Sequence, residues 1–288
     1  MTAGGNFGAR VPEAFETLQG AANERPPRQR GAWWAWLVII IGATYFIVPL
    51  IATLEFSLRP EPPSRAYANV MADQRFFDGL RYSFIVGLIT IVLSLGLIVP
   101  TAYWVRLRLP RLRPVVEFVT LLPFVLPPIV LAYGLIRFYS RQPLVLTGTE
   151  FGSDLLLVAA YVVLSFPYMY RAVDNGLASM DVRVLTEAAQ SLGAGWFRIL
   201  WSVIFPNLRT AALSGAFLTL AIVIGEYTIA SALARDAFGP YLSLLGRDKI
   251  YEPAAVSLIS FGLTWLAMIF LALVARGSRT RVQIGGAR

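Results

Sequence analysis

Six apolar runs set the strongest limit on what this chain can fold into. Each is close to the roughly 20 residues that an α-helix needs to cross the hydrocarbon core of a bilayer. Because lipid offers no partners for exposed backbone amides and carbonyls, such runs are stable in a membrane as helices. We therefore predict an all-α, polytopic membrane protein with six transmembrane helices. The runs are 33–54, 83–105, 114–136, 155–170 with an extension toward 178, 211–233 and 254–275.

The residue types exclude several functional classes. The 288 residues are 57% hydrophobic and 15% charged, whereas soluble domains carry about 25% charged residues. Histidine and cysteine are both absent, which removes imidazole base catalysis, thiol chemistry and zinc sites built from these ligands. We therefore expect no enzyme, no catalytic residue and no metal site.

The charges argue against a nucleic-acid partner and against nucleotide binding by this chain. The formal net charge is +8, but the basic residues are scattered through short loops rather than gathered on one surface. Lys249 is the only lysine, and no G-x-x-x-x-G-K-[ST] motif occurs. A P-loop is therefore excluded, and any ATP that drives this protein must bind to another polypeptide.

The distribution of basic residues predicts the orientation. Sixteen of the 25 Lys and Arg residues fall on the side of the N-terminus when the six runs are threaded through a membrane. Because positive loops remain in the cytoplasm, we expect both termini there. Residues 1–31 are polar and lack the apolar core of a secretory signal, which predicts a disordered tail that is not removed. The membrane domain then covers 32–276, and 277–288 forms a second cytoplasmic tail.

Proline is concentrated in the third run. Pro123, Pro127 and Pro128 stand in the sequence L-L-P-F-V-L-P-P, and each removes a backbone hydrogen bond and can kink its helix. The carbonyls that lose their partners must face protein or a water-lined cavity rather than lipid. Two interpretations stay open, a lining of the transport pathway and a kink without a role in gating.

The segment 181–208, between the fourth and fifth runs, is too polar to span a bilayer. Asp181 can cap a helix N-terminus, and Gly193 and Gly195 supply a break after the first helical piece. A second helical piece follows, and we expect it to end at Pro206. Two short helices joined by a glycine hinge fit a position at the membrane surface.

The residue pattern of this segment resembles a known signature. The sequence E-A-A at 187–189, three further residues, Gly193, nine more residues and V-I-F-P at 203–206 is similar to the EAA motif of binding-protein-dependent ABC importer permeases. The motif of that family ends in I-x-L-P, so this chain departs from it by V for I and by F for L. The resemblance covers the six-helix core, roughly 33–275.

This resemblance implies a type I importer fold, with the chain as one permease subunit in the bacterial inner membrane. The segment around Glu187 is then a cytoplasmic coupling helix that docks into a groove of an ATPase. The implied partners are two ATP-binding cassette subunits that hold ATP and Mg²⁺, a second permease (identical or a paralogue), an extracytoplasmic solute-binding protein and the lipid bilayer. No cofactor is expected on this chain itself. The implied coupling residues are Leu185, Glu187, Ala188, Ala189, Leu192, Gly193 and Pro206.

The helical spacing of the same segment allows a second interpretation. One face is expected to hold Leu185, Ala188, Ala189 and Leu192. Such a helix can also be an ordinary amphipathic surface helix, in which Glu187 only pairs with Arg183 one turn earlier. The full motif spacing favours the coupling interpretation.

Glu226 is the charged residue predicted to lie furthest inside a run. Counted at 1.5 Å per residue from the inner end of the fifth run, it lies below the outer hydrocarbon surface, where charges are costly and mark function by default. A carboxylate beside aromatic rings suits an organic cation, so we predict a substrate pathway. Its residues are Glu226, Tyr227, Thr219, Phe166, Tyr168 and Tyr170. The alternative is that Glu226 hydrogen-bonds a neighbouring helix or a second permease.

Other charged residues near the cytoplasmic edge are expected to have a structural role. Glu117, Arg171 and Asp174 can pair with one another or extend to the interface. No second intramembrane charge of the Glu226 kind is predicted, which leaves that residue as the main candidate for contact with the cargo.

The expected cargo follows from a subgroup resemblance. The stretches 179–194 and 225–231 look similar to polyamine and aminoethylphosphonate permeases, so a polyamine or similar organic cation is favoured. The alternatives within the same machine are an anion, aminoethylphosphonate, iron or another solute, because one fold carries many cargoes. A different class, an ion-coupled secondary transporter that uses Glu226, also stays open, and copurification of an ATPase separates the two classes.

Overall fold

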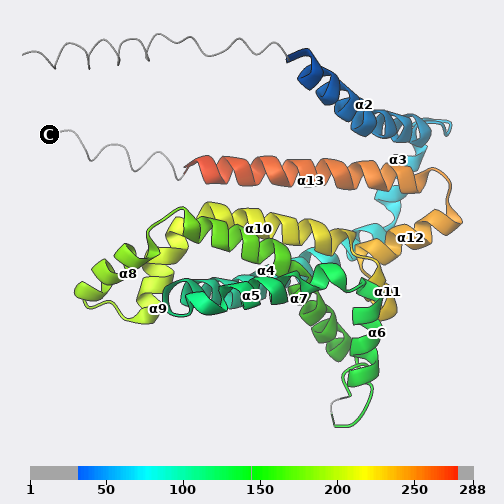
Figure 1. Ribbon diagram of the computed structural model, residues 1–288. Helices are drawn as coiled ribbons and strands as arrows, with labels where there is room; N and C mark the ends of the chain where they lie inside the picture. The colour runs from blue at the N-terminus through cyan, green and yellow to red at the C-terminus, as the bar shows by residue number, and fades with distance from the viewer. Residues whose placement is uncertain (1–31, 144, 278–288) are drawn as a thin grey trace, which may run out of the picture. The chain divides into compact units, whose positions relative to one another are not determined.

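The computed structural model describes residues 32–143 and 145–277 (Figure 1). The chain divides into two compact units, Met1–Ala52 and Thr53–Arg288. In the first unit the described residues belong to one helix, α2 (Ala32–Ser57), whose last turn is assigned to the second unit. The two predicted cytoplasmic tails lie outside the described residues, apart from Gly277.

The second unit is helical in every regular element that the structure describes. A π-helical turn, η2, joins two of its helices, and a short 3-10 helix, η1, stands at one corner. The elements in chain order are α3 (Arg65–Ala72), α4 (Gln74–Arg108), η1 (Pro110–Leu112), α5 (Arg113–Val125), α6 (Pro128–Tyr139), α7 (Glu150–Ala178), α8 (Val182–Ser191), α9 (Trp196–Arg198), η2 (Ile199–Ile204), α10 (Phe205–Gly225), α11 (Thr228–Ala232), α12 (Phe238–Asp248) and α13 (Glu252–Gly277).

Several of these helices are long and apolar enough to cross a membrane. Within the described residues, four qualify, namely α2, α4, α7 and the continuous helix from α9 to α10. The pair α5 and α6 makes a fifth if it is taken as one span, with a bend of 96° at its break. The sixth predicted run lies in α13. The prediction of an all-α, polytopic membrane protein is confirmed.

Two predicted spans are interrupted, and the backbone explains both breaks. Leu126 adopts an extended conformation (ψ 117°), because a residue that precedes a proline disfavours the helical region. The third run is therefore two helices. The fifth run was expected to reach residue 233, but α10 ends at Gly225 and Glu226 is extended (ψ 126°). That boundary was wrong, and α11 is a separate short helix.

The predicted helix end at Pro206 is absent. Pro206 does not end the second helical piece of the 181–208 segment, which was the expectation. It stands at the start of α10, directly after the π-helical turn, and the helix from Trp196 to Gly225 continues through it.

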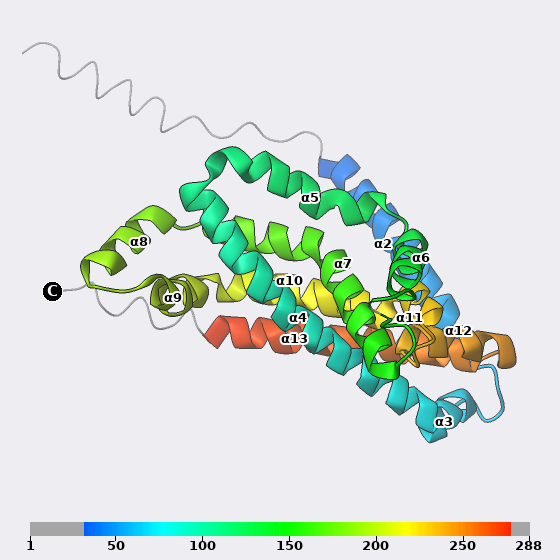
Figure 2. The same cartoon turned by 90° about the horizontal axis from the view of Figure 1, so that it is seen from below.

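The core of the second unit is formed where α4, α7 and α10 pack side by side (Figures 1 and 2). The close approach of α7 and α10 depends on Gly215, where a Cβ would come within 2.8 Å of the Met169 sulfur. In both views α8 lies at one end of this bundle, and α11 and α12 lie at the other. The two predicted sites therefore occupy opposite ends of the bundle.

Candidate coupling helix and transport pathway

The limits of α8 are set by its own sequence. Asp181 precedes the helix, and its carboxylate accepts a hydrogen bond of 3.0 Å from the Val184 N–H, which satisfies one of the free donors of the first turn. The helix ends at Ser191, and Gly193 follows with φ at +78°. Glycine enters this left-handed region without the penalty of a Cβ. The predicted helix start and the glycine break are confirmed.

The inner face of α8 differs from the predicted one. Val182, Thr186 and Ala189 are the buried residues, and Leu185 is half-buried. The Thr186 hydroxyl lies 3.1 Å from the Tyr103 hydroxyl of α4, and this contact ties the helix to the bundle. Sequence spacing had missed the role of Thr186 because a threonine is not counted among apolar positions.

The outer face of α8 carries both apolar and charged groups. Ala188 and Leu192, predicted to share the buried face, are exposed, and Leu192 is 88% exposed. Val184 is also exposed, with 58% of its surface accessible. Within the described residues these side chains are uncovered, so α8 and the residue that follows its last turn present apolar groups that are available to a partner protein.

Glu187 forms the local ion pair that the alternative interpretation requires. Its Oε1 accepts a hydrogen bond of 2.8 Å from the Arg183 Nε, and this bond raises the pKa of Arg183. The two side chains are 60% and 81% exposed, and an ion pair in such surroundings contributes little to stability. The pair therefore orders the surface of α8 without preventing a partner from contacting it.

A cavity of about 450 Å³ opens at the break between α5 and α6. It brings Glu226 and Tyr168 together, as the pathway prediction requires, and adds the proline-rich break itself. The Tyr168 ring packs edge-on against the Phe124 ring, with 5.2 Å between their centroids. The lining consists of Pro123, Phe124, Val125, Leu126, Pro127, Pro128, Leu164, Tyr168, Ile222, Gly225 and Glu226.

The Glu226 carboxylate is already hydrogen-bonded on both oxygens. Its Oε1 accepts from the Ile229 N–H at 2.8 Å, and its Oε2 accepts from the Ala230 N–H at 3.1 Å. The Tyr161 hydroxyl of α7 donates to Oε2 at 3.0 Å. The side chain therefore caps α11 and joins α10, α11 and α7. Sequence reasoning missed Tyr161, because it stands 65 positions before Glu226 in the chain and nothing in the local pattern connects the two.

The other predicted pathway residues lie apart from this cavity. Thr219 is fully buried, and its hydroxyl donates to the Gly215 carbonyl of its own helix at 2.9 Å. Phe166 packs against the apolar core, and Tyr170 lines a second cavity nearer to α8. Tyr227 is 42% exposed and is absent from the lining. Of the six residues, the structure places two at this cavity.

The second unit thus combines apolar helices that are long enough to span a membrane with a short, exposed amphipathic helix at one end of the bundle. Residues 93–283 match the family model described as "Binding-protein-dependent transport system inner membrane component". The match covers more than half of the chain, and the chain belongs to this family.

Curated relatives within the family are sulfate and molybdenum permeases. The chain is 37% identical over 131 residues to the "Probable sulfate transport system permease protein cysT" of Chlorokybus atmophyticus, which covers 43% of this chain and 44% of the relative. It is 29% identical over 267 residues to the "Molybdenum transport system permease protein ModB" of Mycobacterium tuberculosis, with coverage of 88% and 95%. Over 186 residues it is 28% identical to ModB of Escherichia coli K12, with coverage of 59% and 80%.

Solved structures agree on the fold. A bacterial ABC transporter involved in the import of the acidic polysaccharide alginate aligns with a TM-score of 0.66 at 12% identity, over 92% of this chain and 98% of that chain. The MetNI methionine transporter aligns with a TM-score of 0.56 at 20% identity, over 70% and 93%. These likenesses concern the fold alone. The predicted polyamine or aminoethylphosphonate subgroup is not supported, since these curated relatives carry sulfate and molybdenum names.

Proposed function

We propose that this permease subunit imports a small oxyanion, such as molybdate or sulfate, and takes its energy from separate ATPase subunits. Family membership supplies the class of machine, and the named relatives support the choice of cargo. The observation that carries the coupling mechanism is the exposure of Val184 and Glu187 on α8 and of Leu192 directly after it. Because this chain has no P-loop, it needs a contact with a separate ATPase subunit if ATP hydrolysis is to drive its movement.

The two faces of α8 suit it to transmit motion. The inner face is held by Val182, Thr186 and Ala189, and the hydroxyl contact with Tyr103 links it to α4. A rigid-body shift of an ATPase docked on the outer face is then passed to the spanning helices. The bundle acts as a two-state element that nucleotide biases at one end and cargo at the other.

The remaining parts of the assembly follow from the same proposal. Two ATP-binding cassette subunits, a second permease and an extracytoplasmic binding protein complete the importer, and ATP and Mg²⁺ stay on the ATPases. Both termini and α8 face the cytoplasm. An ion-coupled secondary transporter that uses Glu226 receives no support from the family, and three hydrogen bonds already occupy that carboxylate.

The cargo and the energy source are tested together in proteoliposomes that contain the permease, its ATPase and its binding protein. We expect ATP-dependent uptake of radiolabelled molybdate or sulfate, and no uptake of radiolabelled spermidine. Uptake of spermidine alone would reverse the cargo assignment. Uptake that needs an ion gradient and no ATP would reverse the assignment of the machine.

The orientation is tested with single cysteines, because the chain has none of its own. In Ser191→Cys we expect an impermeant thiol reagent to label the protein only after the cells are permeabilised. Gly148→Cys is the matched control on the opposite side of the membrane and is expected to react in intact cells. Labelling of Ser191→Cys in intact cells overturns the proposed topology.

A further inference from the structure

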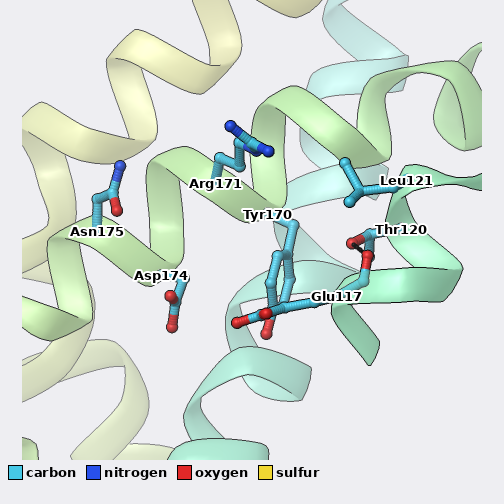
Figure 3. Close-up of a pocket in the computed structure, with 7 residues that line it drawn as sticks. All are labelled: Glu117, Thr120, Leu121, Tyr170, Arg171, Asp174 and Asn175. Carbon is cyan, nitrogen blue, oxygen red and sulfur yellow. Dashed lines mark hydrogen bonds between the residues drawn. The ribbon is translucent and has the colours of Figure 1, made fainter. Parts of the chain in front are cut away.

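A second, polar cavity lies between α5 and α7. It has a volume of about 240 Å³ and lies within two turns of the end of α7 that leads into α8. Figure 3 shows its lining, which combines acidic, basic and uncharged polar groups. The lining residues are Glu117, Thr120, Leu121, Tyr170, Arg171, Asp174 and Asn175.

Both carboxylates of this cavity are neutralised by arginines from the corner between α4 and α5. The Asp174 side chain is only 14% exposed, and it accepts from Arg106 at 3.1 Å and from Arg113 at 2.9 Å. Arg113 also donates to Glu117 at 2.8 Å. The two acidic groups are thus held by two guanidinium groups, so they present little net charge to a ligand.

Arg171 and Asn175 form a separate pair of donors. They stand one turn apart on α7, and Figure 3 shows both on the side of the helix away from Tyr170 and Asp174. Both are exposed, and neither side chain makes a hydrogen bond or ion pair with any other residue in 32–143 or 145–277. A free guanidinium beside a carboxamide N–H₂ is a donor set that suits an oxyanion.

The cavity follows the apolar cavity along the same helices. Leu121 lines the polar cavity, and Phe124, one turn further along α5, lines the apolar one. On α7, Arg171 lines the former and Tyr168 the latter. The Phe124 and Tyr168 rings both line the apolar cavity, and the polar, donor-bearing cavity follows about one turn nearer to α8 on α7.

We propose that Arg171 and Asn175 form an oxyanion-binding station on the α8 side of the Phe124–Tyr168 contact. The proposal rests on the proposed function and names the residues that receive the cargo near the end of its passage. Arg106 and Arg113 serve as positioning residues, because they cancel the charge of Glu117 and Asp174 that would otherwise repel an anion. With both acidic groups neutralised, the Arg171 guanidinium is a positive charge, unpaired within the described residues, on the neighbouring face of α7.

The main test is the initial rate of ATP-dependent uptake of radiolabelled molybdate in proteoliposomes, normalised to the amount of assembled complex. For Arg171→Gln we expect a fall of about 10-fold, the effect of losing one charge-assisted hydrogen bond, and for Asn175→Ala a smaller fall. Arg111→Gln is the matched control, since Arg111 is an exposed arginine of the same corner outside the cavity. Equal uptake by Arg171→Gln and Arg111→Gln overturns the station. If the wild-type complex imports neither molybdate nor sulfate, the proposed function itself has failed.

A second test separates charge from folding. We expect Arg113→Gln to lower uptake because it leaves Glu117 unpaired, and the added change Glu117→Gln to restore much of it by removing the unpaired charge. A double variant that stays as slow as Arg113→Gln shows that the ion pair only supports the fold, and it overturns the charge argument.

A third test asks whether Arg171 binds the transported oxyanion or a lipid, because the phosphate of a phospholipid headgroup is also an oxyanion. The Arg171→Gln comparison is repeated in neutral phosphatidylcholine and in vesicles that also contain phosphatidylglycerol. We expect the same loss of uptake in both membranes. A loss confined to the anionic membrane assigns Arg171 to a lipid phosphate and overturns the cargo station.

Discussion

Glu187 and Glu226 are two glutamates that the sequence marks as functional, and the structure gives them opposite surroundings. Glu187 is 60% exposed, and within the part of the chain that the structure describes it pairs with an arginine four residues earlier in the same helix. Glu226 is 9% exposed and accepts hydrogen bonds from two backbone amides and from a tyrosine of another helix. One carboxylate is free to meet a partner protein, whereas the other is committed to holding three helices together.

This difference shows that the surroundings of a glutamate decide whether it acts in docking or in stability. Removing the partner of an exposed charge costs the protein little stability. A large effect of a substitution at Glu187 would therefore come from a lost contact with another protein. A buried charge whose partners are removed leaves an unpaired ion in a medium of low dielectric constant. Substitutions at the α8 end should therefore affect transport, and substitutions at the Glu226 end should affect stability.

The largest effect is expected where α8 ends. Gly193 has φ at +78°, which proline cannot adopt, so Gly193→Pro should displace the outer face of α8 and abolish ATP-dependent uptake while the protein stays in the membrane. Gly195→Ala is the control, because Gly195 has an ordinary φ of −73° and nothing lies within 4 Å of the added Cβ. Normal uptake by Gly193→Pro, with the ATPase copurifying as in the wild type, removes the coupling assignment.

A similarly large effect on transport is expected at Glu187. Glu187→Lys reverses the charge on the exposed face of α8, and we expect a severe loss of uptake and of ATPase copurification with normal amounts of permease. Arg183→Gln removes the same ion pair from the other side and should leave both readouts near wild type, with no measurable change in melting temperature. Equal defects in the two variants would indicate that the ion pair, rather than a docking contact, is what matters.

At Glu226 the expected effect is on stability. Glutamine has one carbonyl oxygen where glutamate has two acceptors, so Glu226→Gln loses at least one hydrogen bond to a charged group and should cost about 1.5–3 kcal/mol. We expect a lower melting temperature of the purified complex and nearly normal uptake per assembled molecule. The reverse result, normal stability with slow uptake, supports a pathway role for Glu226 instead.

The smallest effect is expected at the contact between α4 and α8. Tyr103→Phe removes a hydrogen bond between two buried hydroxyls and should destabilise the protein by about 1 kcal/mol. Thr186→Val is the companion change, and it should cost more because it leaves the buried Tyr103 hydroxyl without this partner. The melting temperatures of both variants show which change destabilises the protein more. A larger loss of stability for Tyr103→Phe contradicts the expectation.

The sequence by itself determined the spanning helices and the limits of α8. Long apolar runs must form helices in lipid, and both the Asp181 cap and the glycine at φ +78° act within a few residues of the positions they control. The break at Pro127 was also foreseeable, because proline restricts the residue before it. The spacing of E-A-A and Gly193 led to the importer family, which the match over 93–283 confirms.

Only the tertiary structure decided which face of α8 is buried, where the fifth span ends and how charges on different helices pair. The apolar run through 211–233 conceals the turn at Glu226, because hydropathy does not register a carboxylate that caps the next helix. Tyr161 donates to Glu226 from 65 positions earlier, and Arg106 reaches Asp174 across 68 positions. Such pairs form because a buried charge must find a partner wherever packing brings one, and packing between distant helices leaves no periodic trace in the chain.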